Sequence, residues 1–243
     1  MKTVLLAAGK GTRLKPLTDN IPKVMIQING KAILEYHIEQ LAEAGILDIY
    51  INLHHLSEKI KNHFEDGKKW GVKINYSYES EILGTAGALK KLSRELRTDP
   101  FLVVYGDNFL EINYKDFIEY AETKDGIGTI AVFEKEDVQR SGILYFNDNN
   151  KVIRFKEKPS KDEIFSHWVS AGVFYFKKDI FKYIKPGFSD FGFDVLPRIL
   201  ENREKLYAYK LNGEIWGIDS LELLKKLIKR KAKPEIMKLQ ESK

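Results

Sequence analysis

The 243-residue chain is long enough to bury a sizeable core, and its 43% hydrophobic and 31% charged residues are typical of a soluble globular protein. It contains no cysteine, which excludes disulfides, thiolate metal sites and a cysteine nucleophile. The net charge of +5 is concentrated in residues 225–243, where eight Lys or Arg stand against two Glu, so the rest of the chain is close to neutral and a nucleic-acid partner is not expected.

The N-terminus leads directly into an apolar run, without the hydrophobic region and cleavage site of a signal peptide. No apolar run approaches the length of a membrane span. We therefore expect a cytoplasmic protein with no membrane partner.

The first half of the chain alternates between strand and helix patterns. Short apolar runs predict the strands, and apolar residues spaced three and four apart predict the helices. Such alternation predicts crossover units on a parallel sheet with helices on both faces. The predicted strands are 3–8, 49–53, 72–78 and 101–105, and the predicted helices are 32–44, 56–70, 85–96 and 114–123.

From about residue 126 the sequence becomes rich in strands. Two alternating runs within 141–159 flank the polar turn 147–150, which predicts a hairpin. Further elements are a strand at 168–178, a helix at 193–201, a strand at 205–211 and a final helix from Ser220. We predict one mixed α/β domain over 1–243, with halves of about 1–125 and 126–225 and a basic helical tail at 226–243.

A glycine-rich loop follows the first strand in the run "LLAAGKGTRLKPLTDNIPK" (5–23). It is not a dinucleotide fingerprint, because Leu14 stands where the third glycine belongs, and not a Walker loop, because Val4 stands where the first glycine belongs. Glycine turns with cationic side chains around them bind phosphate oxygens through backbone N–H groups and charge. The loop therefore predicts a polyphosphate site, with the cations Lys10, Arg13, Lys15 and Lys23.

A carboxylate follows a second predicted strand, in "FLVVYGD" ending at Asp107. In open α/β sheets the ligand lies at the carboxyl ends of the strands, so Asp107 and the glycine loop should face one crevice. A carboxylate beside a phosphate loop favours a magnesium nucleotide, because Mg²⁺ bridges carboxylates and phosphates. Taken alone, Asp107 would be an ordinary loop-capping residue.

The chain resembles the sugar-1-phosphate nucleotidyltransferases, also called nucleotide-sugar pyrophosphorylases, over roughly residues 1–225. The opening motif is long and specific, and four further motifs follow in the order of the family. They are "LAAGKGTRLKPLTDNIPK" (6–23), "LGTAGAL" (83–89), "YGDNF" (105–109), "FKEKP" (155–159) and "VSAGVFYF" (169–176).

This resemblance implies a Rossmann-like, mainly parallel sheet with a smaller strand-rich sugar-binding lobe, which agrees with the elements predicted above. It implies catalytic roles for Arg13, Lys23 and Asp107, with Mg²⁺ held by Asp107. The implied nucleotide contacts are Leu6, Ala7, Ala8, Gly9, Gly11, Thr12, Arg13, Glu79, Gly84 and Thr85. The implied sugar-phosphate contacts are Gly142, Glu157, Lys158 and Ser170.

The implied reaction transfers a nucleotidyl group from an NTP to a sugar-1-phosphate and releases pyrophosphate. The attacking phosphate oxygen is already ionised, so no general base is required. Catalysis would then rest on in-line positioning and on neutralisation of charge by Mg²⁺, Arg13 and Lys23. The resemblance is compatible with a homo-oligomer.

The second metal ligand departs from the common family pattern Trp-x-Asp-x-Gly-Thr. Two residues after Trp216 stands Ile218, and Asp219 comes one position later. A shorter Gly-x-Asp variant occurs in related uridylyltransferases and fits "GID" at 217–219. Asp219 is therefore expected to bind the metal, with helix capping as the alternative.

Two other functions compete with an active sugar nucleotidyltransferase. One is a catalytically silent sugar-nucleotide-binding regulatory subunit, which should have lost site residues that this chain keeps. The other is a cytidylyltransferase for a non-sugar phosphate such as phosphocholine, which shares the opening motif. "LGTAGAL" and "FKEKP" together favour a sugar.

The identity of the base depends on Glu79, which lies five residues before Gly84 where thymidylyl enzymes use a glutamine. A carboxylate only accepts hydrogen bonds, so it suits the two adjacent donors of guanine better than the single donor of thymine or uracil. This favours GTP with mannose-1-phosphate or a manno-heptose-1-phosphate. The alternatives are a thymidylyl- or uridylyltransferase for glucose-1-phosphate, with Glu79 pointing to solvent.

Overall fold

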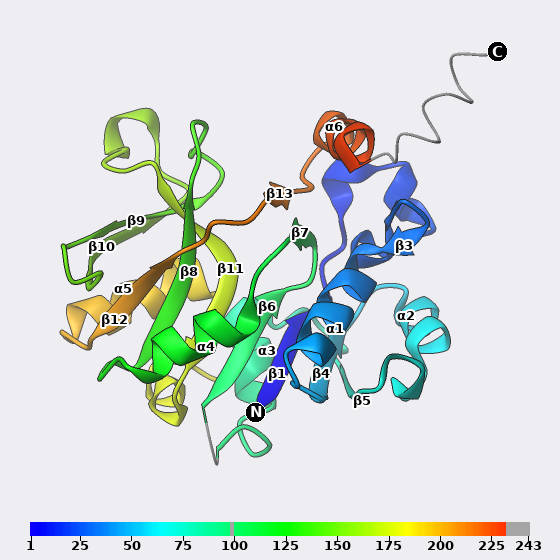
Figure 1. Ribbon diagram of the computed structural model, residues 1–243, viewed down its shortest axis with the longest axis horizontal. Coiled ribbons are helices and arrows are strands. Elements are labelled where there is room, and N and C mark those ends of the chain that lie inside the picture. The colour runs from blue at the N-terminus through cyan, green and yellow to red at the C-terminus, as the bar shows by residue number, and fades with distance from the viewer. Residues whose placement is uncertain (98–99, 232–243) are drawn as a thin grey trace.

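A mixed sheet of nine strands forms the centre of the molecule in the computed structural model, which describes residues 1–97 and 100–231 (Figure 1). Its main path has the strand order β10-β9-β11-β6-β1-β4-β5, and β8 and β12 extend it beyond β11. The neighbours β6, β1, β4 and β5 run parallel, whereas β11 pairs antiparallel with β6, β8 and β9. This confirms the expected α/β fold.

The predicted strands and helices are present, with ends that shift by a few residues. The strands of the large sheet are β1 (Lys2–Leu6), β4 (Asp48–Leu53), β5 (Lys73–Tyr78), β6 (Phe101–Tyr105), β8 (Gly128–Glu134), β9 (Gly142–Phe146), β10 (Val152–Glu157), β11 (Trp168–Phe176) and β12 (Leu206–Lys210). The helices are α1 (Ile33–Glu43), α2 (Ser57–Phe64), α3 (Gly84–Lys91), α4 (Tyr114–Glu122), α5 (Leu196–Glu201) and α6 (Leu221–Lys231).

Helices cover both faces of the sheet. Successive residues of its central strands point to opposite sides, and both sides are apolar, so each needs a layer of helices to bury it. Along β1, Val4 packs into a core with α3 and α5, whereas Leu5 packs into a second core with α1, α2 and α4. The strand-rich half, β8 to β12, continues the same sheet to the left of β1 in Figure 1. The boundary between the two halves near residue 125 stays a prediction.

Three predicted helices are shorter than expected, and the one predicted over 85–96 ends at Lys91. The helix predicted over 56–70 ends at Phe64, since Glu65 (φ 45°) and Gly67 (φ 85°) adopt left-handed backbone, and a 3₁₀ turn covers Lys68–Trp70. The helix predicted over 193–201 begins with a π-helical turn at Phe191–Val195. Among the described residues no helix is long and apolar enough to cross a membrane; a cytoplasmic location stays a prediction.

The C-terminal helix α6 packs through Leu224 and Leu227 on a small core. That core includes Leu14 from the glycine-rich loop and Ile218. The amphipathic helix therefore supports the loop after β1. The part of the predicted basic tail beyond Lys231 lies outside the described residues.

The sequence analysis missed four short strands: β7 (Asn108–Leu110) and β13 (Ile215–Gly217) pair antiparallel, and so do the two-residue strands β2 (Gln27–Ile28) and β3 (Lys31–Ala32). Such short strands show no periodic pattern. Side chains of α1 hold the free edge of β7: His37 Nε2 bonds the Asn108 carbonyl at 2.7 Å, and Gln40 donates to the Leu110 carbonyl at 3.0 Å. The helix thus fixes the segment that immediately follows Asp107.

His37 should make unfolding depend on pH. Burial lowers the pKa of His37 from 6.5 to about 4, although the Asn108 hydrogen bond and the Asp107 charge oppose this shift. The unfolded chain therefore binds one more proton than the folded chain between these values, and stability falls as pH decreases from 6.5 to 4. The expected loss is about 3 kcal/mol.

Urea unfolding of wild type and His37→Gln between pH 4 and 7 measures this loss. The variant keeps a donor toward Asn108 but cannot titrate, so the difference between the two curves isolates the histidine. His167→Gln, at an exposed histidine, is the matched control. Parallel curves for wild type and His37→Gln would contradict the prediction.

Candidate active site

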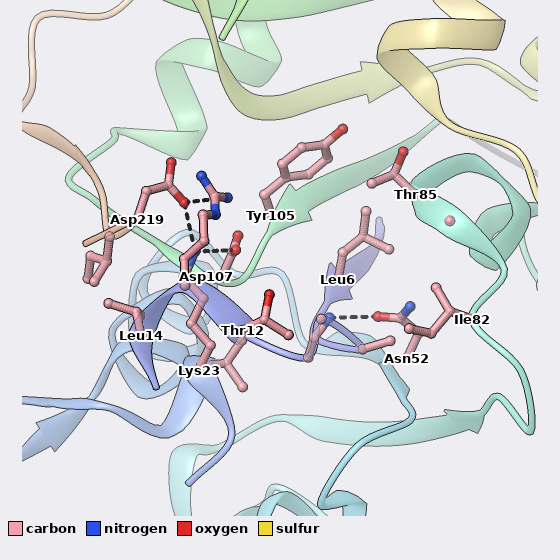
Figure 2. Close-up of a pocket in the computed structure, with 18 of the residues that line it drawn as sticks. Leu6, Thr12, Leu14, Lys23, Asn52, Ile82, Thr85, Tyr105, Asp107 and Asp219 are labelled. Carbon is pink, nitrogen blue, oxygen red and sulfur yellow. Dashed lines mark hydrogen bonds and ion pairs between the residues drawn. The ribbon is translucent and has the colours of Figure 1, made fainter. Parts of the chain in front are cut away.

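A cavity of about 340 Å³ opens at the carboxyl ends of β1, β4, β5 and β6. The residues that the resemblance implies for nucleotide binding or catalysis all line it, and so does Asp219, whereas Lys10 and Lys15, which were also predicted for the polyphosphate site, do not. Those that line it are Leu6, Ala7, Ala8, Gly9, Gly11, Thr12, Arg13, Lys23, Glu79, Gly84, Thr85, Asp107 and Asp219. In Figure 2 Lys23, Asp107 and Asp219 lie toward one end of the cavity, and Asn52, Ile82 and Thr85 lie toward the other.

The glycine-rich loop folds back on itself and so brings Arg13 and Lys23 to one place. Gly11 has left-handed backbone (φ 63°), and a Cβ there would lie 3.0 Å from Thr18 Cγ2 and 3.1 Å from Lys23 Cβ. The Gly11 carbonyl accepts hydrogen bonds from Leu14 N at 2.9 Å and from Thr18 Oγ1 at 2.8 Å. Glycine is therefore required here for both conformation and close approach.

Lys23 is the centre of an ion cluster. Its Nζ lies 2.7 Å from Asp107 Oδ2 and 3.3 Å from Asp219 Oδ1, and the side chain is only 8% exposed. Burial would lower the pKa of Lys23, but the charges of Asp107 and Asp219 outweigh it and raise the pKa above 10.5. Arg13 Nη2 also contacts Asp219 Oδ1, at 2.9 Å. The cluster therefore holds two cations and two carboxylates side by side.

The β7–β13 pair brings the two carboxylates together. Asn108 pairs with Gly217, so Asp107 just before β7 and Ile218 just after β13 emerge at the same end. Ile218 is fully buried in the core against α6, which leaves Asp219 to reach Lys23. Ser220 Oγ, not Asp219, accepts the hydrogen bond from Leu223 N at the start of α6. The helix-capping alternative for Asp219 is therefore wrong, and its metal ligation stays a prediction.

Glu79 is buried, with 1% exposure, so the alternative that it points to solvent is wrong. Its Oε1 accepts from Asn52 Nδ2 at 2.8 Å, and its Oε2 accepts from Leu83 N at 3.0 Å. Asn52 Oδ1 in turn accepts from Ala7 N at 2.6 Å. Both carboxylate oxygens therefore already tie the loop before α3 to the first residue of the glycine-rich loop. Selection of guanine by Glu79 requires carboxylate oxygens that are free to accept hydrogen bonds from the base. In the structure both oxygens already accept hydrogen bonds from the protein, so that requirement is not met.

The four predicted sugar contacts lie in β9, β10 and β11 and in the residue after β10, outside the lining of the cavity. Gly142 and Glu157 are partners in the β9–β10 ladder, and Ser170 Oγ accepts from Gly172 N at 3.2 Å. Lys158 Nζ lies 5.2 Å from the centre of the Phe193 ring. The structure thus gathers these residues in the strand-rich half.

The environment of Glu157 is less polar than that of an exposed carboxylate. Burial raises the pKa of Glu157 to about 7, the neighbouring Lys158 lowers it in part, and the nearby Asp190 charge raises it further. A carboxyl group with this pKa exchanges its proton near neutral pH, so it can donate or accept a hydrogen bond there. The sugar-binding role of Glu157 stays a prediction.

Sequence reasoning missed several lining residues. The polar ones are Asn52, Tyr105 and Asp190. Asn52 is a polar residue within the otherwise apolar end of β4, "INL", and that break was the signal that could have identified it. Asp190 lies between aromatic residues far along the chain, where no pattern connected it to the glycine-rich loop. The remaining missed residues are Leu14, Val24, Ile82 and Ile218.

Known proteins share both the sequence and the fold. The family model described as "Nucleotidyl transferase" matches residues 2–218. The chain is 35% identical to a UTP–glucose-1-phosphate uridylyltransferase of Synechocystis sp. and 32% identical to the mannose-1-phosphate guanylyltransferase catalytic subunit beta of Danio rerio, over 88% of this chain and 59% of each relative. It therefore spans about three fifths of the length of these relatives.

A solved structure agrees with this relationship. The chain superposes on HddC from Yersinia pseudotuberculosis, complexed with GMP-PN, with a TM-score of 0.78 and 27% sequence identity. The match covers 94% of this chain and 98% of that structure. The chain belongs to the nucleotidyl transferase family.

Proposed function

We propose that this chain transfers a nucleotidyl group from an NTP to a sugar-1-phosphate. The observation that carries the proposal is the cluster of Arg13, Lys23, Asp107 and Asp219 at one end of a cavity lined by the glycine-rich loop. A phosphate oxygen of the sugar-1-phosphate attacks the α-phosphorus of the NTP. The bond from that phosphorus to the β-phosphate oxygen breaks, and pyrophosphate leaves with the bonding electrons.

The residues of the chain act here by position and charge. Backbone N–H groups of the loop around Gly9 and Gly11 contact the phosphates, and Arg13 offers a planar fork to their oxygens. Lys23 is held by two carboxylates, so its ammonium stays charged and has a defined position. Fixed cations of this kind stabilise the charge that develops as pyrophosphate leaves, without reorganisation at the moment of reaction.

The two carboxylates also fit Mg²⁺. Asp107 and Asp219 converge on the single cation Lys23, so both already face one point. Within residues 1–97 and 100–231 no three His, Asp or Glu side chains gather as a metal site. Proteins commonly hold Mg²⁺ through one or two carboxylates, while phosphate and water complete its shell. Bound there, Mg²⁺ would neutralise phosphate charge and polarise the phosphoryl oxygens.

The proposed substrates are GTP and mannose-1-phosphate or a manno-heptose-1-phosphate. The guanylyltransferase of Danio rerio and HddC with its GMP-PN ligand support a guanine nucleotide. A second candidate pair is UTP with glucose-1-phosphate, which the 35% identity to the Synechocystis uridylyltransferase favours. A silent regulatory subunit is less favoured, because Arg13, Lys23 and Asp107 all remain and lie in one cluster.

Pyrophosphate release across a matrix of NTPs and sugar-1-phosphates tests this proposal. GTP, UTP, dTTP, CTP and ATP are each combined with mannose-, manno-heptose- and glucose-1-phosphate, and with phosphocholine. We expect the highest kcat/KM for GTP with a manno-configured sugar. A maximum for UTP with glucose-1-phosphate would establish the second candidate. Nucleotide binding without turnover for any pair would establish a silent subunit.

Replacing Glu79 by Gln in the same matrix examines base selection. The amide would place its N–H groups toward the Leu83 N–H or the Asn52 amide, since both Glu79 oxygens now accept hydrogen bonds. We therefore expect a lower melting temperature, by several degrees, and reduced turnover with every base. A variant of unchanged stability that gains UTP or dTTP selectively would show that Glu79 reads the base.

Asp107→Asn should lower turnover by about 100-fold or more, because the change removes one of two carboxylates that face the phosphates. The near-isosteric change should leave the fold intact. Turnover is measured against Mg²⁺ concentration, and circular dichroism checks the fold. Asp125→Asn, at an exposed carboxylate paired with Lys205, serves as the control. Turnover within threefold of wild type at saturating Mg²⁺ would rule out the assigned role.

Lys23→Ala and Arg13→Ala should each lower kcat by about 100-fold with every sugar-1-phosphate, because both cations act on the transferred nucleotide. Lys15→Ala is the matched control: it lies on the same loop, but its partner is Asp19 at 3.0 Å. Steady-state kinetics with two different sugar-1-phosphates supply the comparison. A loss confined to one sugar would place these residues at the sugar instead.

A further inference from the structure

A loop from the strand-rich half caps the helix α3, whose first residues, Gly84 and Thr85, line the cavity. The Ser189 carbonyl accepts from Ala86 N at 2.9 Å and from Gly87 N at 3.0 Å, at the N-terminus of α3. Ser189 N donates in return to the Leu83 carbonyl at 2.9 Å. Two of the first four N–H groups of α3 are therefore satisfied by the other half of the molecule.

Two glycines of "LGTAGAL" make this docking sterically feasible. A Cβ on Gly84 would lie 2.5 Å from the Ser189 carbonyl oxygen, and one on Gly87 would lie 2.4 Å from the Gly187 carbonyl oxygen. The resemblance implied that Gly84 contacts the nucleotide. The structure gives the glycines of this motif an additional role in joining the two halves.

Asp190 lies at the centre of the joint, and both it and Thr85 line the cavity. Asp190 Oδ2 accepts from Thr85 Oγ1 at 2.9 Å, and Thr85 Oγ1 accepts from Phe191 N at 2.8 Å. Asp190 Oδ1 accepts from Gly192 N at 2.8 Å. The Asp190 carboxylate thus accepts a hydrogen bond from the Thr85 hydroxyl, which lines the cavity, and another from the backbone of the turn that begins at Phe191.

That turn packs directly on the predicted sugar residue Glu157. A Cβ on Gly192 would lie 2.4 Å from Glu157 Oε2, so the Glu157 carboxylate rests against the Gly192 backbone. An unbroken series of contacts therefore leads from Glu157 through Gly192 and Asp190 to Thr85. A ligand that reorients Glu157 therefore also acts on the Gly192 backbone. That backbone is connected through the Asp190 side chain to Thr85, which lines the cavity.

We propose that Asp190 is a positioning residue that couples the two substrates, so that a sugar-1-phosphate at Glu157 tightens binding of the nucleotide at Thr85. This inference rests on the proposed function. Coupling between two ligands requires an element whose arrangement both ligands bias. The segment 187–192 is the candidate for such an element, because it contacts Glu157 through Gly192 and is hydrogen-bonded to Thr85 through Asp190.

Calorimetric titration of the intact chain measures the coupling. The probes are the α,β-methylene analogues of GTP and UTP, which cannot release pyrophosphate, titrated in Mg²⁺ buffer with and without saturating mannose- or glucose-1-phosphate. Wild type should bind the matching analogue about tenfold more tightly when the sugar-1-phosphate is present. The reciprocal titration should give the same factor.

Five variants separate coupling from simple loss of structure. Asp190→Asn keeps the backbone contacts of Oδ1, and Thr85→Val keeps the shape of Thr85 without its hydroxyl. Either change should reduce the tenfold factor to below about twofold, and the double variant should lose no more than either single one. Thr85→Ser retains the hydroxyl and should retain the factor, as should the exposed control Asp125→Asn.

Retention of the factor in Asp190→Asn or Thr85→Val would overturn the inference, and so would wild type that shows no factor. If Asp190→Asn fails to fold, the Thr85→Val and Thr85→Ser pair decides the result. The pyrophosphate assay keeps the two proposals apart. Transfer without coupling overturns the role of Asp190 alone, whereas no transfer with any substrate pair overturns the proposed function.

Discussion

The interaction on which the site depends is the buried contact of Lys23 with Asp107 and Asp219. Removing an ammonium from water is costly, and a carboxylate on each side offsets that cost only if both approach closely. The three groups come from the loop after β1, the loop after β6 and the segment after β13. The large sheet brings the first two together, and the β7–β13 pair brings the third.

Buried polar contacts around the cavity keep these loops in place. Asn52 and Glu79 connect the glycine-rich loop to the loop before α3, and His37 holds the strand that follows Asp107. Each is a buried polar group whose hydrogen bonds would be lost if the loops moved, and an unmet buried group costs about 1–3 kcal/mol. The loops around the cavity are therefore held by groups that a sequence pattern of apolar residues does not reveal.

The sequence predicted the elements with strong periodicity, and the structure has them. It predicted the parallel strands, the hairpin β9–β10 and all thirteen nucleotide, catalytic and metal candidates that line the cavity. It could not predict β7 and β13, because strands of three residues form only where a partner and the α1 side chains meet them. Asn52 and Asp190 were missed for a related reason: their partners, Ala7 and Thr85, lie 45 and 105 residues away.

Glu79 shows why chemistry read from a single residue can mislead. Its alignment with a base-reading glutamine was reasonable, but a buried carboxylate must first satisfy its own acceptors, and here the nearest donors belong to the protein. The same logic explains the ion cluster. Lys23 and Arg13 are neutralised by Asp107 and Asp219 within the chain itself. Two cations and two carboxylates leave the cluster without net charge, and the carboxylates raise the pKa of Lys23 despite its burial. The nearly buried lysine therefore stays charged at the point where we propose that the phosphates bind.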